Sequence, residues 1–97
     1  MRFIVYREEF ADGWRTAELR DCLFASESER VARRKQREFF EGEVHRYRKT
    51  YSDIETEQKN EVLIVRAPEQ RRFVRVGLSD ELRPETHVSG VEVPELD

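Results

Sequence analysis

Residues 61–77 read EVLIVRAPEQRRFVRVG, and this stretch decides the fold class. Two runs rich in β-branched and aromatic residues, 61–67 and 72–77, flank a short segment that begins with Pro68. Such a pattern is typical of a β-hairpin. The uninterrupted apolar run 62–65 suits an inner strand of a sheet, whereas Arg75 is expected to point outward. The sequence therefore predicts an antiparallel hairpin as the frame of the molecule.

The N-terminal quarter predicts two more strands. Residues 2–8, RFIVYRE, have the β-branched and aromatic composition of a strand, and residues 11–13 form a turn signal. Apolar residues alternate through much of 14–25, which favours a second strand paired with the first. A short helix that includes Leu19 and Leu23 is the alternative for this segment.

Residues 26–29, Ser-Glu-Ser-Glu, match a capping box, in which a Ser and the Glu three residues later each satisfy a free backbone N–H group. This signal predicts a helix from about Glu27 to Glu41, with Gly42 as its stop. At 100° per residue, one side of this helix is apolar and the opposite side is basic. The apolar side holds Val31, Ala32 and Phe39, and the basic side holds Arg30, Arg33, Arg34 and Arg37.

Residues 43–51 have two interpretations. As a strand, they place His45, Tyr47 and Tyr51 on one face. As a continuation of the helix, they give a 4-3-4-3 apolar seam, made of Phe40, Val44, Tyr47, Tyr51 and Ile54. Because an interior glycine costs about 1 kcal/mol relative to alanine, Gly42 favours the strand, which we predict, followed by a loop over 52–60.

The predicted fold class is α+β, with a small antiparallel sheet in β-β-α-β-β-β order and one amphipathic helix on one face. The other face of the sheet and the basic side of the helix should be exposed. Residues 1–77 form the domain, and 78–97 form an acidic arm that is either extended or disordered. In this arm Val91 and Val93 alternate with polar residues and could add a strand to a sheet edge.

Composition limits the kind of protein. The 97 residues fit one domain, and only 37% are hydrophobic whereas 40% are charged, so the core is thin and a partner or a second copy could cover apolar surface. The one cysteine, Cys22, cannot form an intramolecular disulfide and is expected to be a small core residue. This favours a reducing compartment, and a cytoplasmic protein without membrane contact is expected. Trp14 is expected to close the core.

Charge is segregated along the chain, although the formal net charge is only −3. Residues 1–29 carry −3, 30–49 carry +5, 50–61 carry −3, 62–76 carry +3, and 77–97 carry −5. Basic residues are mostly arginine, with 15 Arg against three Lys. The planar guanidinium group binds phosphates and carboxylates with two hydrogen bonds, so the basic block 30–49 is the candidate binding surface.

Signals of catalysis are missing from the sequence. The four glycines are isolated, so no phosphate-binding loop is present, and no hydrolase signature occurs. Cys22, His45 and His87 do not have the spacing of a zinc site. A catalytic role for His45 beside Tyr47 is a weaker interpretation than a structural one. We therefore expect no enzymatic activity, no cofactor and no metal.

The expected function is binding. Our first hypothesis is a non-enzymatic module that contacts a protein partner through its charged surfaces, with a regulatory or inhibitory role. The alternative is direct binding of DNA or RNA, in which Tyr47 and Tyr51 stack on bases. A third interpretation is a solvated helix side whose arginines pair with nearby carboxylates. The candidate binding residues are Arg30, Arg33, Arg34, Arg37, Arg46, Arg48, Tyr47 and Tyr51.

Size, element order and the passage Phe39-Phe-Glu-Gly-Glu-Val44, interpreted as the step from helix to strand, resemble small phage-encoded anti-CRISPR inhibitors. The resemblance covers residues 1–77 in outline and assigns no role to individual residues. It implies a catalytically silent protein that acts by occupying a nucleic-acid-binding surface.

Overall fold

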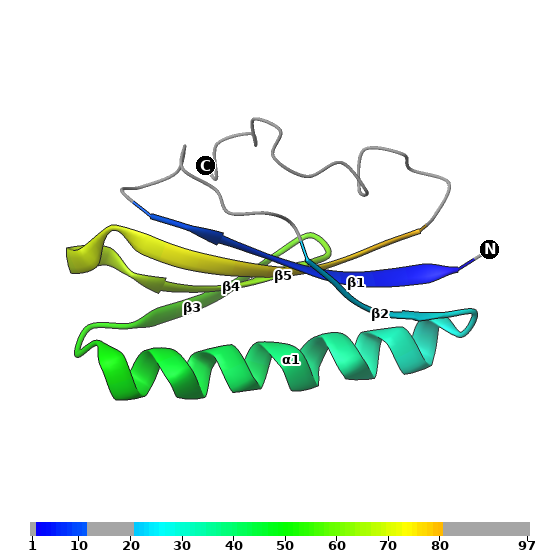
Figure 1. Ribbon diagram of the computed structural model, residues 1–97, viewed down its shortest axis with the longest axis horizontal. Helices are drawn as coiled ribbons and strands as arrows, with labels where there is room; N and C mark the ends of the chain where they lie inside the picture. Colours follow the sequence, from blue (N-terminus) through cyan, green and yellow to red (C-terminus); the bar gives the residue numbers. More distant parts are fainter. Residues whose placement is uncertain (1, 12–20, 81–97) are drawn as a thin grey trace.

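Five strands and one α-helix follow one another in the predicted order within residues 2–11 and 21–80, which the computed structural model describes (Figure 1). No described helix is long and apolar enough to cross a lipid bilayer. The elements are β1 Phe3–Phe10, β2 Asp21–Ser26, α1 Glu29–Thr50, β3 Glu55–Lys59, β4 Val62–Ala67, the 3-10 turn η1 Pro68–Gln70 and β5 Arg72–Asp80.

The strands form one antiparallel sheet in the order β2-β1-β5-β4-β3. The predicted hairpin is confirmed, because β4 and β5 pair from Ala67↔Arg72 to Val62↔Gly77. Arg71 closes the connection in the left-handed region, with φ 55°. The predicted fold class, α+β with one helix on one sheet face, is therefore confirmed.

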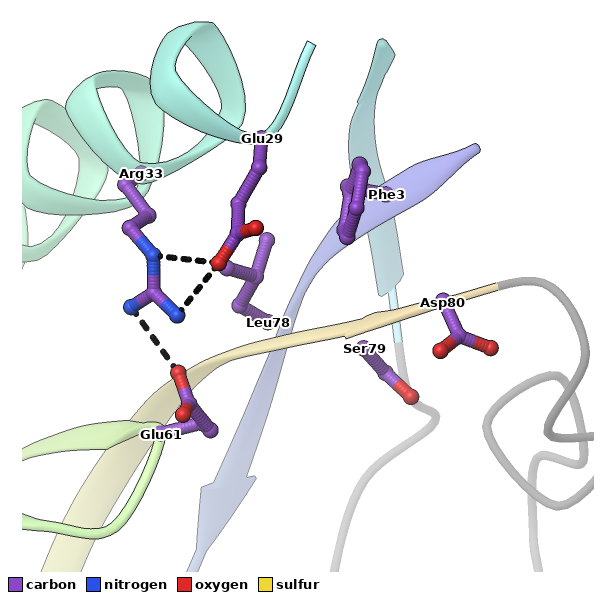
Figure 2. A pocket seen from close by; sticks show the side chains of 7 residues that line it. All are labelled: Phe3, Glu29, Arg33, Glu61, Leu78, Ser79 and Asp80. Carbon is purple, nitrogen blue, oxygen red and sulfur yellow. Dashed lines mark hydrogen bonds and ion pairs between the residues drawn. The ribbon is translucent and has the colours of Figure 1, made fainter. Parts of the chain in front are cut away.

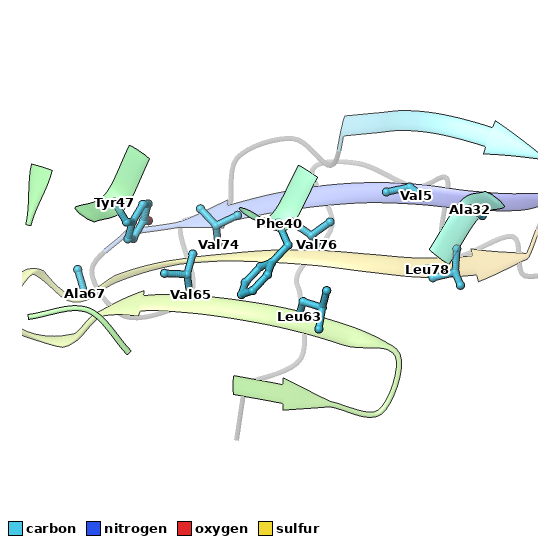
Figure 3. Close-up of a cluster of buried hydrophobic side chains, with 10 residues drawn as sticks. All are labelled: Val5, Ala32, Phe40, Tyr47, Leu63, Val65, Ala67, Val74, Val76 and Leu78. Carbon is cyan, nitrogen blue, oxygen red and sulfur yellow. The ribbon is translucent and has the colours of Figure 1, made fainter. Parts of the chain in front are cut away.

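The main core lies between α1 and the sheet, as Figure 3 shows. Ala32, Phe40 and Tyr47 of α1 pack against strand residues that all point to one face. The strand residues in this core are Val5, Leu63, Val65, Ala67, Val74, Val76 and Leu78. Gln36, also buried, donates hydrogen bonds to the backbone oxygens of Glu61 and Val76 at 2.7 and 2.9 Å. These contacts hold the helix at a fixed position along the sheet.

The face of the sheet opposite α1 is buried, which corrects the prediction of an open face. Phe10 and Phe73 stack with their ring centres 4.4 Å apart, and Ile64 packs against them. The run 62–65 is apolar on both faces, and its alternate residues belong to different clusters, with Leu63 and Val65 in the main core and Val62 and Ile64 on the opposite face. On the same face the Tyr6 ring lies over Gly77, where an added Cβ would come within 2.3 Å of the ring. Only glycine fits beneath this tyrosine without a shift.

The helix begins at Glu29, two residues after the predicted start. Ser28 caps it by accepting a 3.2 Å hydrogen bond from the backbone N–H of Val31. Ser26 cannot be the cap, since it is the last residue of β2 and its hydroxyl accepts from the N–H of Ser28. The predicted capping box between Ser26 and Glu29 is therefore wrong, although a serine cap at this junction is present.

The helix does not stop at Gly42 but continues to Thr50, so the predicted strand over 43–51 is wrong and its alternative is right. Gly42 is exposed and a Cβ there would meet nothing within 4 Å. The cost of about 1 kcal/mol for a glycine inside a helix is outweighed by the burial of the apolar seam. The seam residues Phe40, Val44, Tyr47, Tyr51 and Ile54 all belong to the main core or pack against it.

The strand missing from 43–51 is found at β3, in the segment predicted to be a loop. Its sequence, ETEQK, has no apolar side chain, but it pairs along its length with β4. Cys22 lies exposed on β2, which corrects the expectation of a core cysteine. Trp14, the turn at 11–13 beyond Ala11 and the arm from residue 81 onward lie outside the described residues, whereas 78–80 belong to β5.

Candidate functional site

All six candidate arginines lie on α1, but the structure divides them into two groups. Arg33 and Arg46 form ion pairs. The other four are exposed and have no carboxylate partner among residues 2–11 and 21–80. We call these four the free arginine row: Arg30, Arg34, Arg37 and Arg48.

Arg33 is held near the start of α1 by two carboxylates, as Figure 2 shows. Its guanidinium group lies 2.7 Å from Glu29 and 2.9 Å from Glu61, which follows β3. These residues line a cavity of about 150 Å³ at the end of the sheet. The two carboxylates pair with the single positive charge of Arg33 and more than neutralise it. This cavity therefore does not present a free cation to a ligand.

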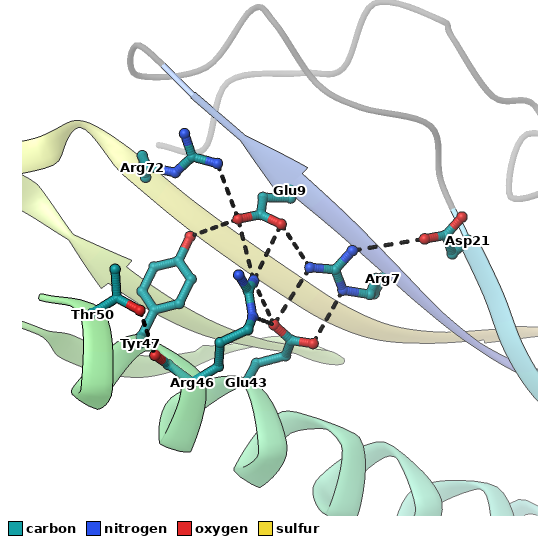
Figure 4. Close-up of polar contacts among 8 residues, drawn as sticks. All are labelled: Arg7, Glu9, Asp21, Glu43, Arg46, Tyr47, Thr50 and Arg72. Carbon is teal, nitrogen blue, oxygen red and sulfur yellow. Dashed lines mark hydrogen bonds and ion pairs between the residues drawn. The ribbon is translucent and has the colours of Figure 1, made fainter.

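Arg46 belongs to a group of ion pairs that joins α1 to the sheet, shown in Figure 4. Arg46 lies 2.8 Å from Glu43 on the same helix and 3.2 Å from Glu9 on β1. Arg7 donates to both carboxylates, at 2.7 Å to Glu9 and 3.2 Å to Glu43. We call this group the paired cluster. It consists of Arg7, Glu9, Glu43, Arg46, Tyr47 and Arg72.

Glu9 is the centre of the paired cluster. Its side chain is 12% exposed and accepts hydrogen bonds from Arg7, Arg46, Arg72 and the Tyr47 hydroxyl. Burial alone would raise the pKa of Glu9, but the hydrogen bond from Arg7 and the other guanidinium groups outweigh it and lower the pKa. Glu9 therefore stays charged, and the cluster is a structural connection.

Tyr47 contributes to the core, which corrects its predicted place on a binding surface. The residue is 0% exposed, so neither face of its ring is open to a base. Tyr51 packs edge-on against it with the ring centres 5.0 Å apart. Burial, followed by the nearby charge of Glu9, raises the pKa of Tyr47 to about 12. The stacking surface expected for single-stranded nucleic acid therefore lacks its main aromatic ring.

The free arginine row and a groove beside it are the remaining candidate site. The row follows helical spacing, at intervals of four, three and eleven residues, so its members lie on the same side of α1. Between this side of α1 and β3 lies a groove of about 460 Å³ that reaches from Arg37 to Arg48. His45 also lines this groove and is exposed, on the helix rather than on a strand.

Neither a known family nor a metal site gives this surface a role. No group of three or more His, Cys, Asp or Glu side chains within the described ranges could hold a metal ion. Comparison of the chain with protein-family models, with curated proteins and with solved structures gives no match. The argument for function therefore rests on the geometry of the residues themselves.

Sequence reasoning missed Arg7, Glu9 and Arg72 as a connected group. Arg7 and Glu9 are two positions apart, but Arg72 lies 63 positions after Glu9, so no local pattern links the three. One signal was present, because three charged residues, Arg7, Glu8 and Glu9, lie in a strand whose other residues are apolar or aromatic. Charged residues in such a strand need partners, and these come from α1 and β5.

Proposed function

We propose that this protein is a non-enzymatic binding module that contacts a protein partner through the free arginine row. The observation that carries this proposal is that four exposed arginines on one side of α1 have no acidic partner among the described residues. Elsewhere the fold pairs its arginines closely, as at Arg46 and Arg75. Arginines left without partners on one helix side are suited to carboxylates of another molecule.

A protein partner is favoured over nucleic acid. The row would accept phosphates, but Tyr47 is buried and the chain as a whole carries a net charge of −3. Glu38 and Glu41 also interrupt the basic side of α1, which weakens attraction to a continuous phosphate backbone. A surface of mixed charge is typical of protein interfaces, where it sets the register of the partner.

An inhibitory role is one form of this function. The resemblance to phage anti-CRISPR inhibitors now rests on size and element order, since Phe39 to Val44 lie inside α1 and do not lead into a strand. Such a protein would bind acidic residues of its partner through the row and thereby block access of nucleic acid to that partner.

The proposal is tested by affinity capture from host lysate with a charge-reversed variant, Arg34→Glu combined with Arg37→Glu. Loss of the partners retained by the wild-type protein is the expected result. Lys49→Glu is the matched control, because Lys49 is exposed on α1 outside the row and has no ion-pair partner within the described part of the chain. Retention of the same partners by the reversed variant contradicts the proposal.

Nucleic acid binding is tested separately with single- and double-stranded DNA and RNA at about 50 mM salt, where electrostatic binding is strong. We expect no shift in mobility. A shift that disappears in the Arg34→Glu, Arg37→Glu variant would replace the protein partner by nucleic acid.

A further inference from the structure

The groove between α1 and β3 combines three features that one ligand could use together. Its walls come from consecutive turns of the helix on one side and from the edge strand on the other. The residues that line it are Arg37, Phe40, Glu41, Val44, His45 and Arg48 of α1, and Thr56 of β3.

The first feature is an apolar floor between two cations. Phe40 is 8% exposed and Val44 packs against the main core, so both present a little carbon surface at the base of the groove. Arg37 and Arg48 lie at its two ends, eleven residues apart, which corresponds to about 16 Å along the helix axis. A ligand that follows the groove therefore meets a cation, then carbon surface, then a second cation.

The second feature is an open strand edge. β3 is the last strand in the sheet order, and no described strand pairs with its outer side. Alternate backbone N–H and C=O groups of such a strand can accept an added strand. Thr56 and Gln58 face α1, because their partners Val65 and Leu63 belong to the main core. An added strand would therefore direct alternate side chains into the groove.

The third feature is the position of Glu41, which lies between the two arginines along the groove. Its charge would repel an acidic side chain at the middle of a ligand. The arrangement thus favours acid at both ends and an apolar residue at the centre.

From these features we infer that the groove binds an extended acidic segment of a partner protein, added as a sixth strand beside β3. This inference rests on the proposed function and names the chemistry of the partner. Strand residues four apart are separated by about 13 Å, and residues six apart by about 20 Å. These two distances lie on either side of the separation of Arg37 and Arg48, so the long arginine side chains can reach acids at either spacing. The recognised pattern is acid, any residue, apolar, any residue, acid.

A second copy of this chain fits the groove less well. Antiparallel pairing of β3 with its own copy would leave both helices on one face and set the two arginine rows toward each other across the junction. Like charges placed face to face are unfavourable. Nucleic acid is also disfavoured, because Phe40 at 8% exposed offers no open ring for a base.

The test is the binding of a labelled synthetic peptide, measured by fluorescence anisotropy with the full chain. The peptide has about nine residues, enough to run past a five-residue strand. It carries glutamate at two positions four apart, valine midway between them and threonine elsewhere. We expect saturable binding that weakens with salt, because the arginines of the groove are exposed.

Two control peptides separate backbone pairing from charge. In the first, N-methyl groups at alternate peptide bonds remove the donors that would pair with β3. In the second, the same residues are rearranged so that the glutamates are five apart and lie on opposite faces of the strand. Both should bind at least about tenfold more weakly, since each loses a set of polar contacts. Equal binding of all three peptides overturns strand addition.

Matched variants locate the site within the row. Arg37→Gln with Arg48→Gln should weaken the peptide by about tenfold or more, whereas Arg30→Gln with Arg34→Gln should leave it within about twofold. Both pairs remove two exposed arginines, but only the first pair lines the groove. If both variants lose the same amount of peptide affinity, the inference that the groove binds the peptide is wrong, and only a general role of the free arginine row remains.

The outcome for the proposed function is distinguishable. If the wild-type chain does not bind the peptide but still loses its captured partners on Arg34→Glu, Arg37→Glu reversal, the groove is wrong and the binding module stands. If the wild-type chain does not bind the peptide and the reversed variant keeps the captured partners, both proposals fail. Two outcomes overturn the assignment of the occupant. One is a dimer in sedimentation that excludes the peptide, and the other is displacement of the peptide by single-stranded DNA.

Discussion

Arg46 and Arg48 are two residues apart on α1, yet their surroundings differ completely. Arg46 lies 2.8 Å from Glu43 and 3.2 Å from Glu9, and its guanidinium group lies 5.2 Å from the centre of the Tyr47 ring. Arg48 is exposed and has no acidic neighbour in residues 2–11 and 21–80. The comparison extends to the whole molecule, where the paired cluster holds α1 to the sheet and the free arginine row faces outward.

This difference teaches that residue type alone does not decide what an arginine does here. Its position on the helix decides which acids it reaches: Arg46 reaches Glu9 on β1, and Arg33 reaches Glu61 beside β3. A partly buried ion pair loses much stability when one partner is removed, since the other charge is left without an acceptor. An exposed arginine without a partner has little such interaction to lose.

The largest expected contrast is between Tyr47→Ala and Arg48→Ala. Tyr47 is fully buried beneath the paired cluster, so loss of its ring should lower the free energy of unfolding by about 3–5 kcal/mol. Arg48→Ala should change it by no more than about 0.5 kcal/mol. Urea unfolding measures both values. A small effect of Tyr47→Ala would mean that this end of the helix does not pack on the sheet.

Glu9→Gln should produce the next largest effect. The variant leaves Arg7, Arg46 and Arg72 without their shared carboxylate, and we expect a loss of about 2–4 kcal/mol, below the range for a fully buried pair. Asp53→Asn is a suitable comparison, since this carboxylate accepts one exposed hydrogen bond from the backbone N–H of Glu69. Its loss should be about 1 kcal/mol or less.

The same variant should change the response to acid. The pKa of Glu9 is lower in the folded chain than its ordinary value of 4.5, so its contribution to stability is present above pH 4.5 and is lost as the pH falls through the folded value. Wild-type protein should therefore lose more stability between neutral pH and acid than Glu9→Gln. Equal losses in the two proteins would show that Glu9 is not the charge that matters.

Tyr47→Phe should have a smaller effect, because it keeps the ring and removes only the hydroxyl that donates to Glu9 at 3.3 Å. We expect a loss of about 1–2 kcal/mol at neutral pH. The folded pKa of about 12 lies above the ordinary value of 10.0 for tyrosine, so this contribution is complete below pH 10 and is lost as the pH rises through 12. Tyrosinate absorbance and unfolding at alkaline pH measure it, and Tyr47→Phe should lack that part of the alkaline loss.

Much of the fold could be predicted because β-branched runs and the turn at Pro68 act locally. The hairpin and the element order follow from such signals. The failures have a physical cause in tertiary context. The sequence predicts a helix stop at Gly42 because the local cost of glycine is visible in it, whereas the burial of Tyr47 and Ile54 against the sheet is not. The sequence does not predict β3, because an edge strand can be held by backbone pairing alone. Its sequence, ETEQK, therefore has no apolar pattern that would indicate a strand.

The candidate site was predicted in part. The sequence predicted Arg30, Arg33, Arg34 and Arg37 on one exposed side of a helix, and all four are exposed. It did not predict that Arg33 pairs with Glu29 and Glu61. It separated Arg46 from Arg48 only in part: Glu43 lies three residues before Arg46, but Glu9, the second acid that pairs with Arg46, lies 37 residues away in the chain. Nor could it show the groove, which exists because the helix continues past Gly42 and runs beside β3.

The smallest expected effect is also the one with the opposite sign. Arg34 lies four residues after Arg30 and three before Arg37, and both arginines repel it, whereas Glu38, four residues further on, is paired with Lys35. Like charges at these helical spacings destabilise by about 0.2–0.5 kcal/mol, and Arg34→Gln should therefore raise the free energy of unfolding by a few tenths. Arg33→Gln, the adjacent control, should lower it by about 0.3–1 kcal/mol because it removes the ion pairs to Glu29 and Glu61. Both differences are electrostatic and should shrink at about 1 M salt, where the screening length is near 3 Å.

If Arg34→Gln instead destabilises the chain as much as Arg33→Gln, Arg34 has an acidic partner and the distinction between the paired and the free arginines is lost. A stabilising substitution, by contrast, would show that the fold tolerates a repulsive row that it does not need, which is the condition expected of a surface kept for another molecule.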